Sequence, residues 1–220
     1  MKKVIVAGSS GMVGQLILQL CLNEKSISEV ISLVRQPLNL SHVKLREIVV
    51  EDFLHYTPHE EQFKGVDVVY YCVGVYTGAV PRDLFRMITV DYPMALAQTI
   101  KKHAPKSAFV LLSGQGVDRQ EKSRMMFAKD KGEVENKLEA LLGPLFFTCR
   151  PGYIYPVQKR KEPNFSYVLS RKLYPVLKLL GKKLSITSEE LALAMFLIGL
   201  KKPQKTLFEN DELREYLTVV

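Results

Sequence analysis

The fold of this chain is decided by the stretch Val4-Ile5-Val6-Ala7-Gly8-Ser9-Ser10-Gly11-Met12-Val13-Gly14. A short run of apolar, β-branched residues leads into three glycines, and an amphipathic helix pattern follows directly. Gly8 allows a tight turn after the strand, Gly11 lets the backbone approach a pyrophosphate, and Gly14 lets the helix pack closely on the strand. The helix amides and dipole would then face the anion. The stretch therefore predicts a strand–loop–helix unit that binds the phosphates of a dinucleotide.

The predicted phosphate loop offers both backbone and hydroxyl donors. Ser9 and Ser10 supply the hydroxyl groups, and the glycines let the backbone come close to the ligand. A glycine-rich turn that binds nothing is the alternative interpretation. The expected contacts with the cofactor come from Gly8, Ser9, Ser10, Gly11, Met12, Val13 and Gly14.

Short apolar strands alternate with helical patterns through the first 150 residues. Continuous apolar strands indicate parallel pairing with helices on both faces of the sheet. We therefore predict an α/β fold with a doubly wound parallel sheet of the Rossmann type. The expected strands are 3–7, 30–34, 45–50, 66–72, 107–112 and 145–150, and the expected helices are 12–23, 82–102 and 125–142.

The pattern changes after Arg150, where a stretch rich in proline and lysine begins. We predict a single domain over 1–220, with its sheet core in 1–150 and a small C-terminal lobe in 151–220 packed on that core. The expected elements of the lobe are helices over 166–180 and 188–200, the second with Thr187 or Ser188 as its N-cap, and a final strand and helix over 206–220.

The composition is that of an ordinary globular domain. The 220 residues are 47% hydrophobic and 25% charged, which excludes a disordered, collagen-like or disulfide-rich chain. No apolar run reaches the roughly 18 residues of a membrane-spanning helix. The three cysteines predict reduced thiols in a cytoplasmic protein. Neither the cysteines nor the four histidines have metal-ligand spacing, so no metal site is predicted.

The ends of the next strands suggest which dinucleotide binds. Arg35 follows the second strand and has no acidic neighbour, at the place where an acid would bind a ribose hydroxyl and a base suits a 2′-phosphate. This favours NADP(H), with a solvated arginine as the alternative. Asp52 after the third strand is a candidate acceptor for the adenine amino group, or is merely solvated. Val73 and Gly74 follow the fourth strand, where strand ends form the ligand crevice.

Several motifs, in this order and spacing, resemble the atypical short-chain dehydrogenase/reductases, in particular their Tat-interacting-protein group of NADP-binding proteins. The resemblance covers nearly the whole chain and implies a nicotinamide cofactor, a small-molecule substrate and further cofactor contacts from Phe53, Pro151 and Ile154. The motifs are the glycine loop, Leu33-Val34-Arg35, Leu111-Leu112-Ser113-Gly114-Gln115-Gly116-Val117-Asp118, Lys131-Gly132-Glu133-Val134-Glu135 and Arg150-Pro151-Gly152.

The resemblance also implies where the catalytic residues lie. In that superfamily a Ser, a Tyr and a Lys act together, and the Tyr precedes the Lys by one helical turn. Lys131 matches the Lys, which binds the ribose, but the Tyr position holds Phe127, which has no proton to exchange. Ser113 matches the catalytic Ser, although a shift of one residue would place Gly114 there. Ser113 and Lys131 are thus the candidate catalytic residues, with a satisfied turn serine and a solvated helix lysine as the alternative interpretations.

Three tyrosines could replace the missing hydroxyl, namely Tyr76, Tyr153 and Tyr155, which lie in loops expected to border the crevice. Tyrosines in such loops can equally pack and hydrogen-bond locally.

The basic charge of the chain is concentrated late in the sequence. The net charge of the whole chain is +8, and 151–205 alone carries +8. This basic segment could cap the substrate pocket, touch an anionic membrane surface through 159–183, or bind nucleic acid. The resemblance favours the cap, because family members build the substrate pocket after Arg-Pro-Gly. We predict no nucleic-acid partner.

Two functions fit these observations. The first is an NADP(H)-dependent oxidoreductase that lacks the usual tyrosine and transfers hydride to a flavin or quinone-like acceptor, for which solvent supplies the proton. The second is a catalytically silent protein that binds and senses NADP(H). The loss of the tyrosine favours the second, whereas the glycine loop, Arg35 and Lys131 fit both.

Overall fold

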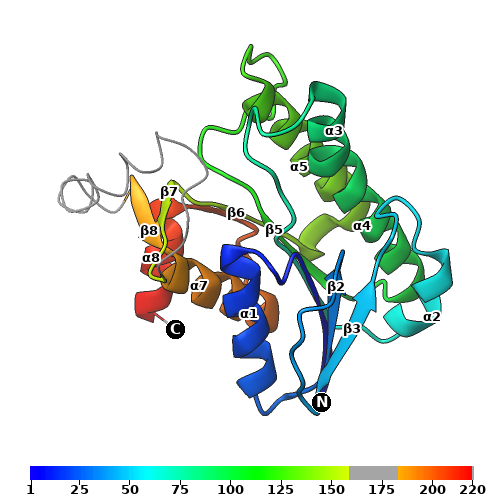
Figure 1. Cartoon of the computed structure of the whole chain (residues 1–220). Coiled ribbons are helices and arrows are strands. Elements are labelled where there is room, and N and C mark those ends of the chain that lie inside the picture. Colours follow the sequence, from blue (N-terminus) through cyan, green and yellow to red (C-terminus); the bar gives the residue numbers. More distant parts are fainter. Residues whose placement is uncertain (159–182, 220) are drawn as a thin grey trace.

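The computed structural model describes residues 1–158 and 183–219. Its centre is a seven-stranded sheet in which every neighbouring pair of strands is parallel, in the order β3-β2-β1-β4-β5-β6-β9 (Figure 1). The strands are β1 (Lys2–Ala7), β2 (Ile27–Val34), β3 (Leu45–Val49), β4 (Val68–Tyr71), β5 (Ala108–Leu112), β6 (Phe146–Arg150) and β9 (Leu207–Glu209).

The strand order reverses direction next to β1. The chain runs outward from β1 to β3, returns to β4 on the other side of β1, and continues to β9. Such a reversal opens a crevice at the carboxyl ends of the strands on either side of it, which is where open α/β sheets bind ligands. The prediction of a doubly wound parallel sheet is confirmed, and each of its six predicted core strands forms.

Helices cover both faces of the sheet (Figure 1). One face carries α1 (Met12–Asn23), α7 (Ser188–Lys201) and α8 (Asn210–Val219), and the other carries α2 (Glu60–Phe63), α3 (Arg82–Arg86), α4 (Tyr92–His103) and α5 (Met126–Leu142). A π-helical turn, Met87–Asp91, joins α3 to α4, so the predicted helix over 82–102 is one continuous helical run.

The double covering explains why the last four residues of the first strand, Val4 to Ala7, are all apolar. Val4 and Val6 pack in the cluster beneath α1 and α7, whereas Ile5 and Ala7 pack in the cluster beneath α4 and α5. All four side chains are completely buried. Alternating residues of a strand point to opposite faces, so a strand covered on both sides needs apolar residues at every position.

The sheet continues past Arg150, where we had predicted that it ends. The predicted final strand and helix form as β9 and α8, but β9 pairs with β6 and extends the main sheet. Helix α7 lies against α1 and covers the same face, and its buried residues include Leu191 and Met195. Without these elements β6 would be an edge strand with an uncovered apolar face.

The start of α7 follows the sequence prediction. Thr187 is the N-cap, its Oγ1 accepts a hydrogen bond from the Glu190 amide at 3.1 Å, and Glu190 accepts one from the Thr187 amide at 2.9 Å. This capping box satisfies two amides that the helix itself leaves unpaired. A small parallel sheet of β7 (Tyr153–Tyr155) and β8 (Ser185–Thr187), which we had not predicted, precedes it. The predicted helix over 166–180 lies outside the described residues.

Candidate active site

The glycines of the first loop stand where no side chain fits. Gly8 has a φ of +83°, and a Cβ on it would lie 2.8 Å from the backbone of Cys72 and Val73 at the end of β4. A Cβ on Gly14 would lie 2.2 Å from the Gly8 carbonyl oxygen. The loop is therefore folded tightly between β4 and α1, as a backbone cradle for phosphates requires.

The first turn of α1 opens onto this cradle. Gly11 is the N-cap of the helix and makes no side-chain cap. Met12 and Val13, the first residues of the helix, line a cavity that begins here. An N-terminus without a side-chain cap presents its amides and its positive dipole end to an anion. The local geometry thus fits the dinucleotide phosphates.

One of the two hydroxyl groups of this loop is engaged inside the protein. The Ser9 side chain is buried, and its Oγ lies 2.5 Å from Oγ of Ser32 on β2. This hydroxyl therefore fastens the loop to the sheet and is not aimed at a phosphate, so Ser9 can contribute only its backbone. Ser10 is exposed, which leaves its hydroxyl accessible to a ligand.

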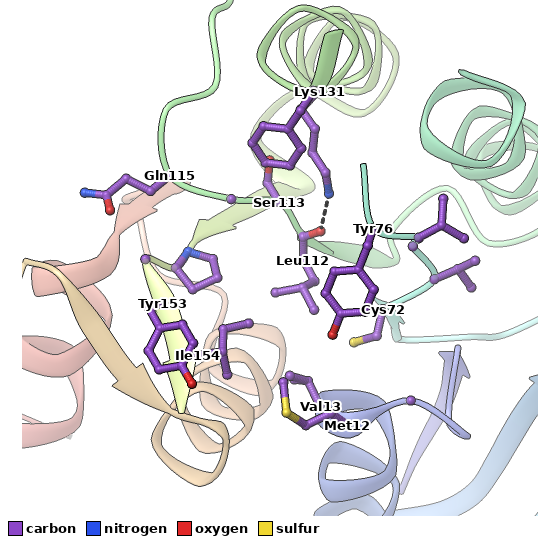
Figure 2. Close-up of a pocket in the computed structure, with 18 of the residues that line it drawn as sticks. Met12, Val13, Cys72, Tyr76, Leu112, Ser113, Gln115, Lys131, Tyr153 and Ile154 are labelled. Atoms are coloured by element: carbon purple, nitrogen blue, oxygen red, sulfur yellow. Dashed lines mark hydrogen bonds between the residues drawn. The ribbon is translucent and has the colours of Figure 1, made fainter. Parts of the chain in front are cut away.

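A cavity of about 670 Å³ lies at the carboxyl ends of the central strands (Figure 2). It runs from the start of α1, past the ends of β4 and β5, to the segment after β6. This is the position expected for a ligand in an open α/β sheet. It brings together nine of the predicted site residues, namely Gly11, Met12, Val13, Val73, Gly74, Ser113, Lys131, Pro151 and Ile154.

Arg35 and Asp52, which were predicted to bind the adenosine end of the cofactor, do not line the cavity. Leu33 pairs with Ala7, so Arg35 follows β2 at the same sheet edge as the glycine loop, and its side chain is exposed. The Asp52 carboxylate accepts hydrogen bonds from the Leu54 amide at 2.8 Å and pairs with His55 Nδ1 at 2.6 Å. The bond with His55, together with the Leu54 amide, holds the pKa of Asp52 below its ordinary value.

The side chain of Phe53 packs inside the protein. The ring is only 6% exposed and stacks on Tyr92, with 5.5 Å between ring centroids. It packs in the hydrophobic cluster beneath α4, so only the backbone of Phe53 can contact a cofactor.

Lys131 enters the cavity from α5. Its Nζ donates a hydrogen bond to the Leu112 carbonyl oxygen at 3.0 Å and lies 6.0 Å from the centroid of the Phe127 ring. Burial lowers the pKa of Lys131 to about 8, although the charge of Glu135 opposes this shift. The ammonium group is thus held at the end of β5, where it faces the cavity (Figure 2).

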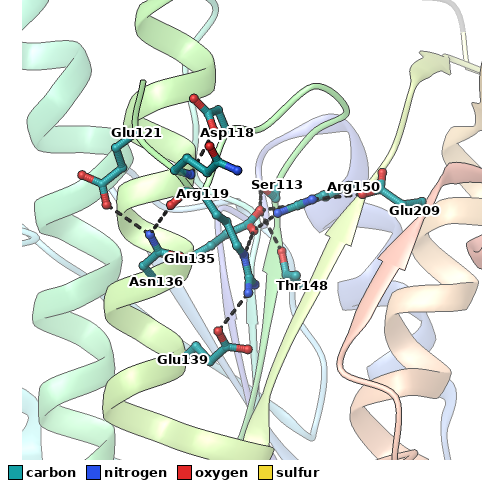
Figure 3. A network of polar contacts seen from close by, with 11 residues as sticks. Ser113, Asp118, Arg119, Glu121, Glu135, Asn136, Glu139, Thr148, Arg150 and Glu209 are labelled. Atoms are coloured by element: carbon teal, nitrogen blue, oxygen red, sulfur yellow. Dashed lines mark hydrogen bonds and ion pairs between the residues drawn. The ribbon is translucent and has the colours of Figure 1, made fainter. Parts of the chain in front are cut away.

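Ser113 contributes to the cavity wall, but its hydroxyl is used elsewhere. The Oγ donates a hydrogen bond to Glu135 Oε1 at 2.5 Å, and the residue is 8% exposed (Figure 3). The residue that faces the Phe127 ring is Gly114, because a Cβ on Gly114 would lie 2.7 Å from the Cζ of Phe127. Of the two positions that the sequence left open, Gly114 is the one opposite Phe127, and the Ser113 hydroxyl already donates its hydrogen bond to Glu135.

Glu135 is the centre of a buried ionic network (Figure 3). Its carboxylate is completely buried and accepts hydrogen bonds from Arg150 of β6, Arg119 and Thr148 as well as from Ser113. Burial alone would raise the pKa of Glu135, but the bonds from Arg150, Ser113 and Arg119 hold it below its ordinary value. The network joins α5 to the ends of β5 and β6 and so fixes the wall behind Lys131.

Sequence reasoning assigned no role to Glu135, although its motif was recognised. A signal was present, since Glu135 follows Lys131 by one helical turn, the spacing at which two charged side chains of a helix can interact. Close packing explains why this motif has glycine at residue 132, because a Cβ on Gly132 would lie 1.8 Å from the Asp118 carbonyl oxygen.

Two of the three tyrosines proposed as replacements reach the cavity. Tyr76 and Tyr153 line it, whereas Tyr155 is absent from the described lining. Gln115, Val75 and Pro156 also line it and were not predicted. Among residues 1–158 and 183–219 there is no cluster of three metal-binding side chains and no helix long and apolar enough to cross a membrane. The basic stretch 159–182 lies outside these ranges.

Several solved structures share the fold of this chain. A short chain dehydrogenase family protein from Francisella tularensis matches with a TM-score of 0.66 and 14% identity, over 93% of each chain. Gre2 from Candida albicans, solved in complex with NADPH, matches with a TM-score of 0.70 and 16% identity, over 96% of this chain and 78% of its own. No family model matches the sequence. The fold and the motifs of this chain are similar to those of the atypical short-chain dehydrogenase/reductases.

The relatives in sequence are more particular. The chain is a homologue of protein HTATIP2 from Rattus norvegicus, to which it is 29% identical over 175 residues, 79% of this chain and 70% of the relative. It is also 26% identical over 159 residues to the mitochondrial protein FMP52 from Debaryomyces hansenii, covering 71% of this chain and 69% of the relative.

Proposed function

We propose that this protein is an NADP(H)-dependent oxidoreductase that works without the tyrosine acid of its family. The observation that carries the proposal is the glycine cradle of β1 and α1 opening directly into the cavity that holds Lys131. The structural similarity to Gre2, whose structure contains NADPH, supports a nicotinamide cofactor.

Residues of the glycine loop and of the strand ends beside it could contact every part of such a cofactor. The amides of the first α1 turn and the exposed Ser10 hydroxyl would hold the phosphates, and Arg35 would pair with a 2′-phosphate. Asp52, which is half exposed, would accept the adenine amino group. Lys131 would donate to the ribose hydroxyls at the other end. Pro151 and Ile154 would border the nicotinamide.

The chemistry of the site is set by what surrounds the nicotinamide position. The bound cofactor supplies or accepts a hydride. The chain contributes orientation, exclusion of water by an apolar wall and one ammonium group. Phe127 carries no exchangeable proton, so proton transfer from that position is not available.

The second candidate is a protein that binds NADP(H) and does no chemistry. The packing of the Phe127 ring against Gly114 favours it, because neither of these two positions then carries a hydroxyl. An oxidation assay with NADPH and carbonyl, flavin and quinone acceptors separates the two candidates. Turnover of at least one acceptor class supports the oxidoreductase; binding of NADPH without any turnover supports the sensor.

Arg35→Ala is expected to weaken NADPH binding by about tenfold to 100-fold while leaving NADH binding unchanged, since it removes a charge-assisted contact with the 2′-phosphate. Isothermal titration with both cofactors measures this. Arg46→Ala, an exposed arginine on the neighbouring strand β3, is the matched control and should change neither affinity. Equal losses for NADPH and NADH in Arg35→Ala would contradict the assignment.

We further propose that the chain is one domain and that it works in a reducing compartment, the cytoplasm. The pairing of β9 with β6 supports the single domain, and three free cysteines, two of them buried, support the reducing compartment. The name of FMP52 places that relative in mitochondria, so fractionation of cells that express the protein is the test of the compartment.

A further inference from the structure

The half of the cavity beyond the cradle is lined by aromatic and apolar side chains. Phe127, Tyr76 and Tyr153 form much of this wall, together with Val75 and Ile154. Among the described residues that line the cavity, Lys131 is the single side chain that carries a charge. Such a lining fits a flat, largely apolar ligand, and it offers one cation to any negative charge that develops on that ligand.

The missing acid restricts which acceptors the site can reduce. Hydride addition to an isolated ketone or aldehyde produces an alkoxide, a strong base that needs a proton as it forms. The positions where the family carries hydroxyl groups hold Gly114 and the Phe127 ring, packed against each other. Hydride addition to a quinone produces the hydroquinone monoanion, a much weaker base whose charge is spread over the aromatic ring.

We propose that the site reduces planar quinones and that the Lys131 ammonium stabilises the hydroquinone anion as it forms. This inference rests on the proposed function, because the reductant is the dihydronicotinamide cofactor. One hydride, carrying two electrons, leaves the cofactor for the quinone, which becomes the hydroquinone monoanion. A proton from solvent then completes the hydroquinone, so the protein needs no fixed acid.

Lys131 is placed to serve this charge. Its Nζ is held by the Leu112 carbonyl oxygen at 3.0 Å and lies beside the Phe127 ring, at the border between the cradle and the aromatic wall. Four side chains already donate to the Glu135 carboxylate, and Lys131 forms no ion pair of its own with a carboxylate in the described structure. With a pKa of about 8, Lys131 is mainly protonated at neutral pH and loses its charge in mildly alkaline solution.

Binding of two matched ligands tests the role of Lys131 without turnover. The probes are 2-hydroxy-1,4-naphthoquinone, which is an anion at neutral pH, and its neutral methyl ether, 2-methoxy-1,4-naphthoquinone, titrated calorimetrically into the protein saturated with NADP⁺. At pH 7 the anion is expected to bind about tenfold or more tightly than the ether. The preference should fall as the pH rises above about 8.

Two substitutions complete this test. Lys131→Gln should abolish the preference for the anion at every pH, and Lys131→Arg should keep it into alkaline solution because arginine stays protonated. Circular dichroism of each variant verifies that it is folded. Equal binding of the two probes by the wild type, or an anion preference that survives in Lys131→Gln, would overturn the role of Lys131.

A second experiment tests the acceptor class. NADPH oxidation is followed with 2-methoxy-1,4-naphthoquinone and with 1-tetralone, a bicyclic ketone of similar shape, after subtraction of the rates without protein. The quinone should react about 100-fold faster or more. If NADPH does not bind, the proposed function fails. If NADPH binds and 1-tetralone reacts as fast as the quinone, or the quinone is not reduced, only the quinone inference fails.

Discussion

Glu135→Ala is expected to lower the free energy of unfolding by about 3–5 kcal/mol, because it leaves the guanidinium groups of Arg150 and Arg119 without their buried partner. Breaking one side of a buried ion pair costs far more than the pair itself contributes, since the remaining charge is poorly solvated. Urea denaturation followed by circular dichroism measures the change.

The same helix provides the control for this variant. Glu139 also pairs with Arg119, at 2.8 Å, but its side chain is 51% exposed. Glu139→Ala should therefore change the free energy of unfolding by about 1 kcal/mol or less. A loss of similar size in both variants would show that burial of the network is not the cause.

The pH dependence of the Glu135 effect has a definite sign. The pKa of Glu135 is lowered in the folded protein, so its stabilising contribution is fully present above the pKa of an unfolded glutamate, about 4.3. The contribution is lost as the pH falls through the lower folded value. The difference in unfolding free energy between wild type and Glu135→Ala should accordingly shrink in acid.

Gly14→Ala is expected to remove most cofactor binding and to destabilise the fold by about 1–3 kcal/mol. The added Cβ would lie 2.2 Å from the Gly8 carbonyl oxygen, so α1 must move away from the loop. Losing two amide–phosphate contacts would weaken NADPH binding by about 100-fold or more. Thermal denaturation and titration with NADPH measure the two effects.

Gly74→Ala tests whether an added side chain collides with the cofactor at a position where it collides with no protein atom. A Cβ on Gly74 meets no protein atom within 4 Å, although the residue lines the cavity. This variant should keep the stability of the wild type to within about 0.5 kcal/mol. The NADPH affinity of this variant should fall if the cofactor runs past Gly74.

For Gly14→Ala, unchanged stability and unchanged NADPH affinity would contradict the role of the glycine loop as a phosphate cradle.

Much of the fold could be predicted because it follows from short-range patterns. The cradle of β1 and α1 depends on consecutive residues, and so does the capping box of Thr187 and Glu190. The central strands β4 and β5 were recognisable because each is apolar at every position. These features can be predicted without knowing which segments, far apart in the sequence, contact each other in the fold.

The features of the candidate site that could not be predicted have the opposite origin. The Ser9 hydroxyl forms a hydrogen bond with the Ser32 hydroxyl, and the Ser113 hydroxyl donates one to Glu135. The Phe53 ring stacks on Tyr92. Each partner comes from a different strand or helix, so nothing in the local sequence shows that the side chain is already engaged. The extension of the sheet by β9 was missed for the same reason, because pairing with β6 is a long-range contact.

The contact between Gly114 and Phe127 makes the two positions depend on each other in evolution. A Cβ at residue 114 would lie 2.7 Å from the ring, so the ring can keep its place only while residue 114 is glycine. In a double-mutant cycle, Gly114→Ser and Phe127→Tyr should therefore be non-additive in unfolding free energy by about 0.5–3 kcal/mol; additive effects would contradict this dependence. Which side chains residue 114 can carry is therefore set by the ring at residue 127, and a change at either position alters what the other tolerates.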